Sequence, residues 1–223
     1  MSCLAGVRLD GVAKHYSTAS GTVHALDGIT LQVDPGSNVA ITGPSGCGKS
    51  TLLGLIAGLD VPTVGRVVVG GAVISSLSDA GRARARRHDI GLVYQSDNLL
   101  PFLTAVENVG LQLSLDGESN SADRCRDLLA AMGLAEHADK LPDQLSRGQR
   151  QRIAVARALI HEPALILADE PTGSLDATSA ADIVALLVAA DATLIVVSHD
   201  PWVVSQLERS VGLRDGRLAT VGA

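Results

Sequence analysis

Residues 43–51 have the residue types and spacing of a phosphate-binding loop. They are Gly43, Pro44, Ser45, Gly46, Cys47, Gly48, Lys49, Ser50 and Thr51, so a glycine and four further residues precede Gly-Lys-Ser. The glycines can take positive φ angles and let backbone N–H groups converge on an anion. Lys49 can bring a cation to the outer phosphates, and the hydroxyl of Ser50 can ligate Mg²⁺. The stretch predicts a nucleoside triphosphate site and leaves open what the energy is used for.

A pair of carboxylates follows an apolar run in the last third of the chain. Residues 164–168 read Ala-Leu-Ile-Leu-Ala and predict a buried strand, after which come Asp169 and Glu170. Asp169 is suited to Mg²⁺, usually through its waters, and Glu170 is free to polarise an attacking water. Pro171 is expected to keep the Glu170 backbone extended. The plain alternative is a solvated strand terminus, which the preceding apolar run disfavours.

Two more polar residues come directly after predicted strands. Gln95 follows residues 90–94, and His199 follows residues 193–198. Because ligands of open parallel sheets bind at the carboxyl ends of the strands, these residues are expected to join the phosphate loop and the carboxylates in one site. Taken singly, Gln95 is more simply a surface amide and His199 a structural histidine. Their combination with the phosphate loop makes a shared site the better explanation.

Two further features have plain interpretations that the spacing alone favours. Ser146, Gly148 and Gln149 lie in a stretch, residues 145–149, that predicts a second helix start able to receive an anion. An ordinary serine N-cap explains the same pattern. Tyr16 is either a half-buried strand residue or a surface on which a base stacks.

The remaining pattern predicts alternating helices and strands. Residues 7–33 alternate polar and apolar positions around glycines and predict antiparallel strands, and residues 66–74 predict another hairpin arm. Helices are expected over residues 49–57, 122–132, 146–161 and 178–190, and from Pro201. Residues 82–87 carry four arginines, which we interpret as a solvated helix face rather than a phosphate or lipid contact.

Composition narrows the class of protein. A chain of 223 residues, rich in small apolar residues and poor in aromatic ones, fits one α/β domain with a buried parallel sheet. A net charge of −6 argues against a nucleic-acid partner. Cys3, Cys47 and Cys125 are too far apart for a predicted disulfide framework or zinc site, which fits a reducing cytoplasm. The sequence shows no secretory signal and no apolar run of about 20 residues, so no membrane span is expected.

With these residues in view, the chain resembles the ATP-binding cassette ATPases along nearly its whole length. Residues 43–51 are similar to that family's Walker A segment, residues 165–169 to Walker B, and residues 145–149 to its Leu-Ser-Gly-Gly-Gln signature. Gln95 is similar to the Q-loop, residues 174–176 to the D-loop, His199 to the switch histidine and Tyr16 to the adenine-stacking aromatic. This order along one chain reverses the preference for the plain interpretations of Tyr16, His199 and Ser146.

The resemblance implies ATP and Mg²⁺ as cofactors and assigns roles by position. Glu170, His199 and Lys49 would be catalytic, and Ser50, Gln95 and Asp169 would serve the metal. The residues in contact with ATP would be those of the phosphate loop (43–51), together with Tyr16, Gln95, Ser146, Gly148 and Gln149.

The resemblance also implies a fold and partners. The expected fold is α/β, with a P-loop (RecA-like) core, an antiparallel β subdomain and an inserted helical subdomain within about residues 96–161, all in one ATP-binding domain over residues 1–223. Two copies would form a head-to-tail dimer in which the signature of one copy closes on ATP held by the other. An integral membrane permease would be the partner, with the ATPase in the cytoplasm, peripheral on the inner face of the cell membrane.

A narrower resemblance is to the lipoprotein-releasing and macrolide-exporter class of ATPase subunits, and it rests on residues 90–95, 98–101, 103–105, 107–108 and 168–173. The main hypothesis is therefore the ATPase of an export or extraction complex. A regulatory ATPase that controls a cell-wall hydrolase or division complex fits the same motifs. A small-molecule phosphotransferase gives no account of residues 146–149 or His199. Arg147 stands where the family signature has its first glycine, and it adds bulk and charge near the expected phosphates.

Overall fold

The computed structural model describes residues 4–19, 21–118, 121–173 and 175–219, and these build two sheets. The smaller sheet is antiparallel, in the order β2-β1-β4-β5. Its strands are β1 (Val7–Thr18), β2 (Gly21–Val33), β4 (Val64–Val69) and β5 (Ala72–Val73). The antiparallel strands and the hairpin arm expected from the sequence are confirmed.

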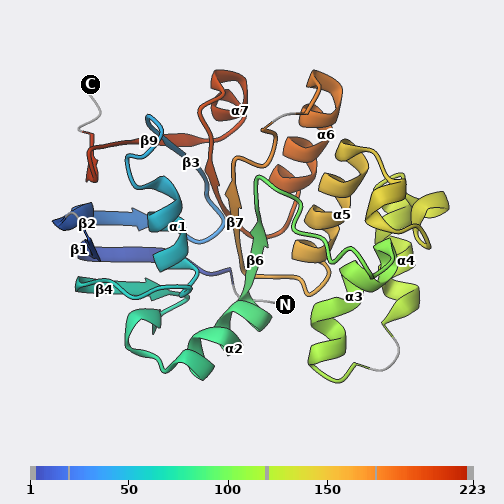
Figure 1. The fold of residues 1–223 in the computed structure, drawn as a ribbon, viewed down its shortest axis with the longest axis horizontal. Helices are drawn as coiled ribbons and strands as arrows, with labels where there is room; N and C mark the ends of the chain where they lie inside the picture. The colour runs from blue at the N-terminus through green and yellow to red at the C-terminus, as the bar shows by residue number, and fades with distance from the viewer. Residues whose placement is uncertain (1–3, 20, 119–120, 174, 220–223) are drawn as a thin grey trace.

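The larger sheet has six strands in the order β10-β9-β3-β8-β7-β6. Four of them are β3 (Asn38–Thr42), β6 (Ile90–Val93), β7 (Leu165–Asp169) and β8 (Thr193–Val197). The other two are β9 (Arg209–Arg214) and β10 (Arg217–Leu218). All neighbouring pairs are parallel except β9 and β10. Figure 1 shows this sheet through the centre of the molecule.

Both faces of the larger sheet are buried, which explains why its strands are apolar runs. Along β7, Leu165 and Leu167 join the core shared with α1 and the antiparallel sheet. Ile166 and Ala168, which point the other way, join the core shared with the helices. The period of two along a strand therefore divides one sequence run between two cores.

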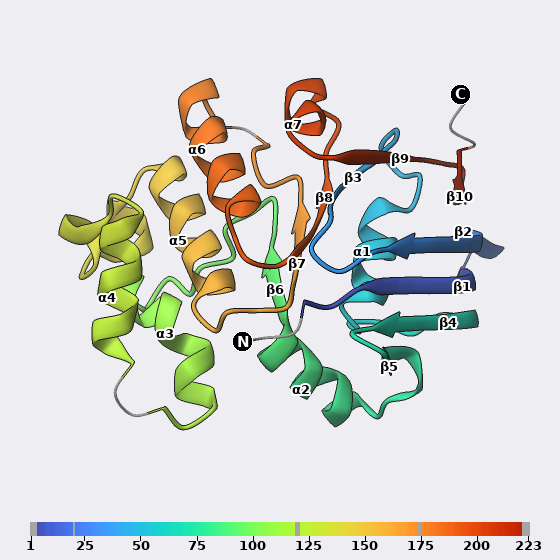
Figure 2. The same ribbon diagram turned by 180° about the vertical axis from the view of Figure 1, so that it is seen from behind.

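Two helices lie on the side of the antiparallel sheet, and the others lie beyond the opposite face of the larger sheet (Figures 1 and 2). The first two are α1 (Lys49–Ile56) and α2 (Asp79–Asp89), the latter after a 3₁₀ turn over Ile74–Ser76. The others are α3 (Ala105–Leu115), α4 (Ala122–Ala131), α5 (Arg147–Leu159), α6 (Ala177–Val188) and α7 (Pro201–Ser205). Short 3₁₀ turns over Ala135–His137 and Pro142–Gln144 connect α4 to α5.

The arginines of α2 are less free than the sequence suggested. Arg82 Nε and Arg86 Nη1 donate to the carbonyl oxygen of Gly58, at 3.1 and 2.7 Å. Gly58 follows directly after α1, so these cations lie at the negative end of that helix. The interpretation of the cluster as a solvated helix face is therefore wrong for Arg82 and Arg86. Among the described residues, no helix is long and apolar enough to cross a membrane.

Candidate functional site

The predicted meeting of strand ends is present in the structure. β3, β8, β7 and β6 are consecutive neighbours and all run parallel, so the residues that follow them share one edge of the sheet. Gly43 follows β3, His199 follows β8, and Glu170 follows β7. Gln95 follows β6 at the same edge, and Figure 2 labels all four of these strands.

The phosphate loop depends on glycine at specific positions. Gly43 and Gly48 have φ angles of 149° and 105°. A Cβ atom on Gly43 would lie 2.1 Å from the carbonyl oxygen of Leu213, and one on Gly48 would lie 2.4 Å from that of Ala25. Leu213 belongs to β9, a strand that the sequence did not predict. The loop is therefore shaped by both sheets, and only glycine fits at these two positions.

Lys49 and Ser50 begin α1 with their polar groups at the loop. Lys49 Nζ donates to the carbonyl oxygens of Gly43 and Pro44, each at 2.8 Å. Ser50 and Asp169 line one small cavity, to which α1 and β7 both contribute. A hydroxyl and a carboxylate are oxygen ligands of the kind that Mg²⁺ prefers, so the donor set fits the metal expected from the sequence. That helix start is also the favourable end of a helix dipole for an anion.

Glu170 and His199 are in direct contact. Nδ1 of His199 lies 2.7 Å from Oε1 of Glu170. The backbone N–H of Glu170 donates to the carbonyl oxygen of Val197 at 2.9 Å, which ties the residue to β8. The φ angle of Glu170 is 47°, in the left-handed region. The expected extended backbone before Pro171 is therefore wrong, because the turn after β7 is sharper than an extended residue allows.

Gln95 lies against the turn that follows Glu170. A Cβ atom on Gly173 would lie 3.2 Å from Nε2 of Gln95. The backbone N–H of Gly173 donates to the carbonyl oxygen of Glu170 at 3.0 Å. Gln151, a buried residue of α5, donates to the carbonyl oxygen of Tyr94 at 3.0 Å and fixes the strand end before Gln95. The structure thus places Gln95 beside the carboxylate turn.

The start of α5 carries a complete capping box. Ser146 Oγ accepts from the backbone N–H of Gln149 at 3.3 Å, and Gln149 Oε1 accepts from that of Ser146 at 2.8 Å. Nε2 of Gln149 also lies 2.8 Å from Nε2 of His137. The ordinary N-cap that the sequence allowed is therefore present. It leaves Ser146 exposed at the start of the helix, where a ligand can reach it.

The next two residues of this stretch contact neighbouring elements. A Cβ atom on Gly148 would lie 2.9 Å from Oγ of Ser179 in α6. The backbone N–H of Ser179 donates to Asp176, the N-cap of α6, at 2.9 Å. Nη2 of Arg147 lies 3.5 Å from the carbonyl oxygen of Gly173. Ser174 of the expected D-loop lies outside the described residues.

Tyr16 lies on β1 with its side chain 38 % exposed. Its hydroxyl donates to Oδ2 of Asp60 at 3.0 Å. Burial and the neighbouring Asp60 raise the pKa of Tyr16, and a hydroxyl contact with Thr51 opposes that rise. Tyr16 is therefore beside the first turn of α1, close to the phosphate loop.

The two expected anion-binding helix starts are separate within a single chain. The phosphate loop begins α1, whereas Ser146 begins α5, and the two helices lie on opposite sides of the six-stranded sheet (Figures 1 and 2). The chain therefore has two separate helix starts suited to an anion. Gln95, Glu170 and His199 share an edge with the first of them.

Asn108 belongs to the narrower resemblance, but the sequence did not show that its side chain is fully buried in α3. Its Oδ1 accepts from the backbone N–H of Leu100 at 2.8 Å. Its Nδ2 donates to the carbonyl oxygens of Leu100, Leu103 and Thr104. A polar residue within an otherwise apolar helix face was the only available signal. Asn108 fixes the segment that leads from Gln95 into α3.

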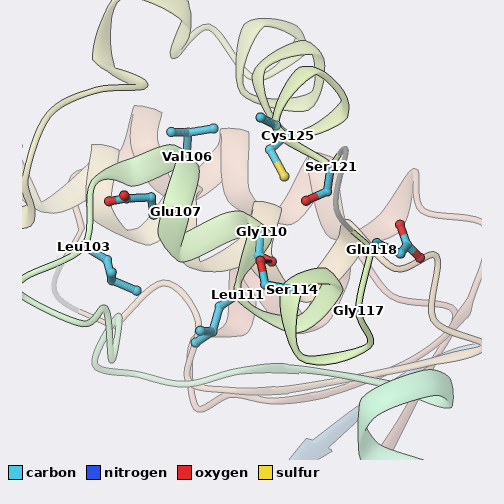
Figure 3. A pocket seen from close by; sticks show the side chains of 11 residues that line it. Leu103, Val106, Glu107, Gly110, Leu111, Ser114, Gly117, Glu118, Ser121 and Cys125 are labelled. Atoms are coloured by element: carbon cyan, nitrogen blue, oxygen red, sulfur yellow. Dashed lines mark hydrogen bonds between the residues drawn. The ribbon is translucent and has the colours of Figure 1, made fainter.

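A groove runs between α3 and α4 next to this segment. Its walls come from one face of α3 and from the start of α4, as Figure 3 shows. Leu103, Val106 and Leu111 are apolar walls, and Glu107 and Glu118 stand at its edge. Phe102, the residue before Leu103, is 72 % exposed. The segment after Gln95 thus presents an apolar surface to solvent.

Comparison with known protein families decides the identity. The ABC transporter family matches residues 26–173. The chain belongs to that family. Members similar to it include "Lipoprotein-releasing system ATP-binding protein LolD" of Xanthomonas oryzae pv. oryzae, 42 % identical over 95 % of this chain and 89 % of the relative. The protein of the same name from Shewanella frigidimarina is 40 % identical over 97 % and 93 %.

Solved ABC structures agree closely with this fold. The dimeric post-hydrolysis state of the ATP-binding cassette MJ0796, bound to ADP and Pi, superposes with a TM-score of 0.89 at 38 % identity. A second dimeric structure of MJ0796, a bacterial ABC transporter cassette, gives 0.88 at 40 %. Each covers 96 % of this chain, which covers 97 % of each. The chain is thus an ATP-hydrolysing ABC subunit with the P-loop core, antiparallel β subdomain and helical subdomain expected from its sequence.

Proposed function

We propose that two copies of this chain close head to tail on ATP and so drive a membrane permease of the lipoprotein-releasing class. The supporting observation is the separation of the phosphate loop from the Ser146 helix start on opposite sides of one sheet. A second copy supplies the missing half of each site. The names of the relatives favour lipoprotein release, and the MJ0796 structures are dimers.

Within each site, different residues at the sheet edge bind the phosphates, bind the metal and activate the water. Lys49 and the loop N–H groups bind the phosphates, while Ser50, Asp169 and Gln95 serve Mg²⁺. The metal, when bound, offsets charge on the phosphates, and the chain positions the reactants around it. Glu170 accepts a hydrogen bond from the attacking water and polarises it. His199 holds the Glu170 carboxylate through their 2.7 Å contact and faces the outer phosphate.

The second copy closes the site with Ser146, Gly148 and Gln149. The free backbone N–H groups at the start of α5 bring the positive end of a helix dipole toward the outer phosphate. No acidic residue lies in the first turn of α5, so nothing there repels an anion. ATP thus joins the two copies, and its hydrolysis releases them.

Closure is passed to the permease through the residues after Gln95. Arg150 of α5 donates to Asp97 at 2.9 Å, and Arg157 donates to the carbonyl oxygen of Asp97 at 2.9 Å. The helix that begins at Ser146 is therefore tied to the segment beside the groove of Figure 3. We assign residues 97–108 and this groove to an apolar segment of the permease, which places the ATPase peripherally on the inner face of the membrane.

The decisive experiment uses the Glu170→Gln variant. With ATP and Mg²⁺, it should form a stable dimer in size-exclusion chromatography, and ADP should leave it monomeric. The wild-type chain should copurify with one integral membrane protein that stimulates its ATPase activity. A chain that stays monomeric with ATP would overturn the composite site. Copurification with a hydrolase or division protein, with no permease, would favour the regulatory ATPase instead.

A further inference from the structure

The ring of Tyr16 is held by a partly buried ion pair as well as by its strand. Asp60 accepts from the Tyr16 hydroxyl through Oδ2 at 3.0 Å, and from Lys14 Nζ through Oδ1 at 2.7 Å. We refer to Lys14, Tyr16 and Asp60 as the Asp60 clamp. One carboxylate therefore binds two side chains of β1, one with each oxygen.

Lys14 is the least exposed member of the clamp. The residue is 9 % exposed, and its Nζ atom also donates to the carbonyl oxygen of Val61 at 2.9 Å. A buried ammonium group requires a paired charge, so Asp60 cannot turn away without leaving it uncompensated. The backbone N–H of Val61 donates to the same oxygen, Oδ1 of Asp60, at 2.7 Å. These contacts fix the carboxylate in one orientation.

Lys14 also covers one side of the tyrosine ring. Residues two apart on a strand share a face, and Nζ of Lys14 lies 4.9 Å from the centroid of the Tyr16 ring. A cation at that distance interacts favourably with the ring. The face with the ammonium group is closed to a stacking partner, so a base has only the opposite face.

Asp60 connects the ring to the phosphate loop. It lies just after α1, and the backbone N–H groups of Leu59 and Asp60 both donate to the carbonyl oxygen of Gly54 within that helix. α1 begins at Lys49, so the carboxylate moves with the helix that carries the loop. The clamp therefore joins the antiparallel sheet, where Tyr16 lies, to the phosphate-binding helix.

We propose that Asp60 and Lys14 are positioning residues that hold the Tyr16 ring in place for a purine base and leave one face open to it. The inference rests on the stacking of the ATP base on Tyr16, which the family resemblance implies. The ring then meets the base without first being ordered, which removes an entropic cost of binding. The lowered pKa of Asp60 and the raised pKa of Tyr16 agree with an ionised acceptor and a neutral donor at neutral pH.

The test compares a ligand that carries a base with one that lacks it. Binding of ATP and of inorganic tripolyphosphate, both with Mg²⁺, is measured by calorimetry for the full chain and its variants. Tyr16→Phe and Asp60→Asn should each weaken ATP binding about three- to tenfold, the loss expected for one hydrogen bond. Neither should change tripolyphosphate binding. The double variant should lose less ATP affinity than the two single losses combined, since both variants weaken the Tyr16–Asp60 contact, while Asp60→Asn also removes the charge that pairs with Lys14.

A matched control is Asp10→Asn. Asp10 lies on β1, like Lys14 and Tyr16, and its carboxylate pairs with Arg66 and Arg8. Asp10→Asn should leave the binding of both ATP and tripolyphosphate unchanged. A parallel loss of ATP and tripolyphosphate binding in Asp60→Asn would overturn the inference, since it would show general support of α1. Tyr16→Ala separates the remaining cases. If it alone weakens ATP binding, stacking is right and the clamp is wrong; if it has no effect, the stacking role itself fails.

Discussion

Nδ1 of His199 lies 2.7 Å from Oε1 of Glu170, although the two residues follow different strands. Their strands β8 and β7 are parallel neighbours, with Asp169 opposite Val197. The Glu170 side chain is 15 % exposed and that of His199 is 74 % exposed. The histidine therefore stands on the solvent side of the carboxylate, where a second subunit or a nucleotide can meet it.

Replacing Glu170 by glutamine keeps the shape of the side chain and removes its negative charge. We expect phosphate release to fall at least about 100-fold, the range typical of a lost general base, with ATP affinity retained. Phosphate release and nucleotide binding are measured on the same preparation. Glu162→Gln is the control, because Glu162 is an exposed carboxylate paired with Arg124. Unchanged turnover in Glu170→Gln would assign the base elsewhere.

Removing the ammonium group of Lys49 should weaken nucleotide binding itself. Its Nζ atom is held over the loop by the carbonyl oxygens of Gly43 and Pro44. We expect Lys49→Ala to lose at least about tenfold in ATP affinity, because a charge-assisted bond contributes about 1.5–3 kcal/mol. Lys140→Ala serves as the control lysine. Equal ATP affinity of the two variants would contradict the loop assignment.

A methyl group at Gly148 should disturb the start of α5 without touching the phosphate loop. Its Cβ atom would lie 2.9 Å from Oγ and 3.3 Å from Cβ of Ser179. Overpacking of this kind costs about 1–3 kcal/mol, so we expect ATP-driven dimer formation and turnover to fall about tenfold, with ATP binding to the separate chain unchanged. Ser179→Gly, combined with Gly148→Ala, should restore part of the turnover. No restoration would mean that contact with Ser179 is not the cause.

Loss of the Asn108 amide should destabilise the segment over residues 97–108, which we propose binds the permease. The amide bonds four backbone groups of residues 100–104, and the residue is fully buried. Asn108→Ala should lower the free energy of unfolding by about 2–4 kcal/mol, since buried partners lose their bonds. Urea unfolding measures the change. Gln32→Ala, at an exposed amide, should stay within about 0.5 kcal/mol of the wild type.

The stability of the chain should fall in mild acid because of His161. Burial lowers the pKa of this residue, with His88 and Arg124 contributing in the same direction, whereas an Ile90 backbone contact and Asp116 oppose it. The unfolded chain then takes up the proton first, so stability decreases as pH falls below about 6.5. His161→Gln should reduce this decrease. Urea unfolding at pH 7.5 and 5.5 provides the comparison, and identical slopes for both chains would exclude His161.

Sequence reasoning located the sheet edge because each of its residues follows an apolar run. Glu170 and His199 could be placed at neighbouring strand ends from the parallel-sheet rule, but their contact required the order of the strands. β9 escaped prediction because residues 209–214 begin and end with arginine and have only Val211 and Leu213 as large apolar residues, so no long apolar run marks the strand. Without β9, the reason why Gly43 must be glycine could not be found.

Positions that depend on side-chain partners were also out of reach. Nothing in the sequence around Asp60 shows that Lys14 is buried or that Tyr16 donates to the same carboxylate, because these residues are far apart in the chain. The prediction that the arginines of α2 are solvated was wrong for a similar reason. Arg82 and Arg86 donate to the carbonyl oxygen of Gly58, which lies at the end of α1. Local patterns predicted elements and strand ends, whereas long-range polar contacts needed the fold.

The left-handed backbone of Glu170 bears on any attempt to raise the thermal stability of this protein. Glycine is the residue that such a conformation suits, and a glutamate held there costs about 1–2 kcal/mol. Selection for thermal stability alone would therefore favour glycine at position 170. The resulting chain would be more stable, but it would lack the Glu170 carboxylate. The native sequence keeps a glutamate at this position, where the proposed mechanism uses its carboxylate to polarise water.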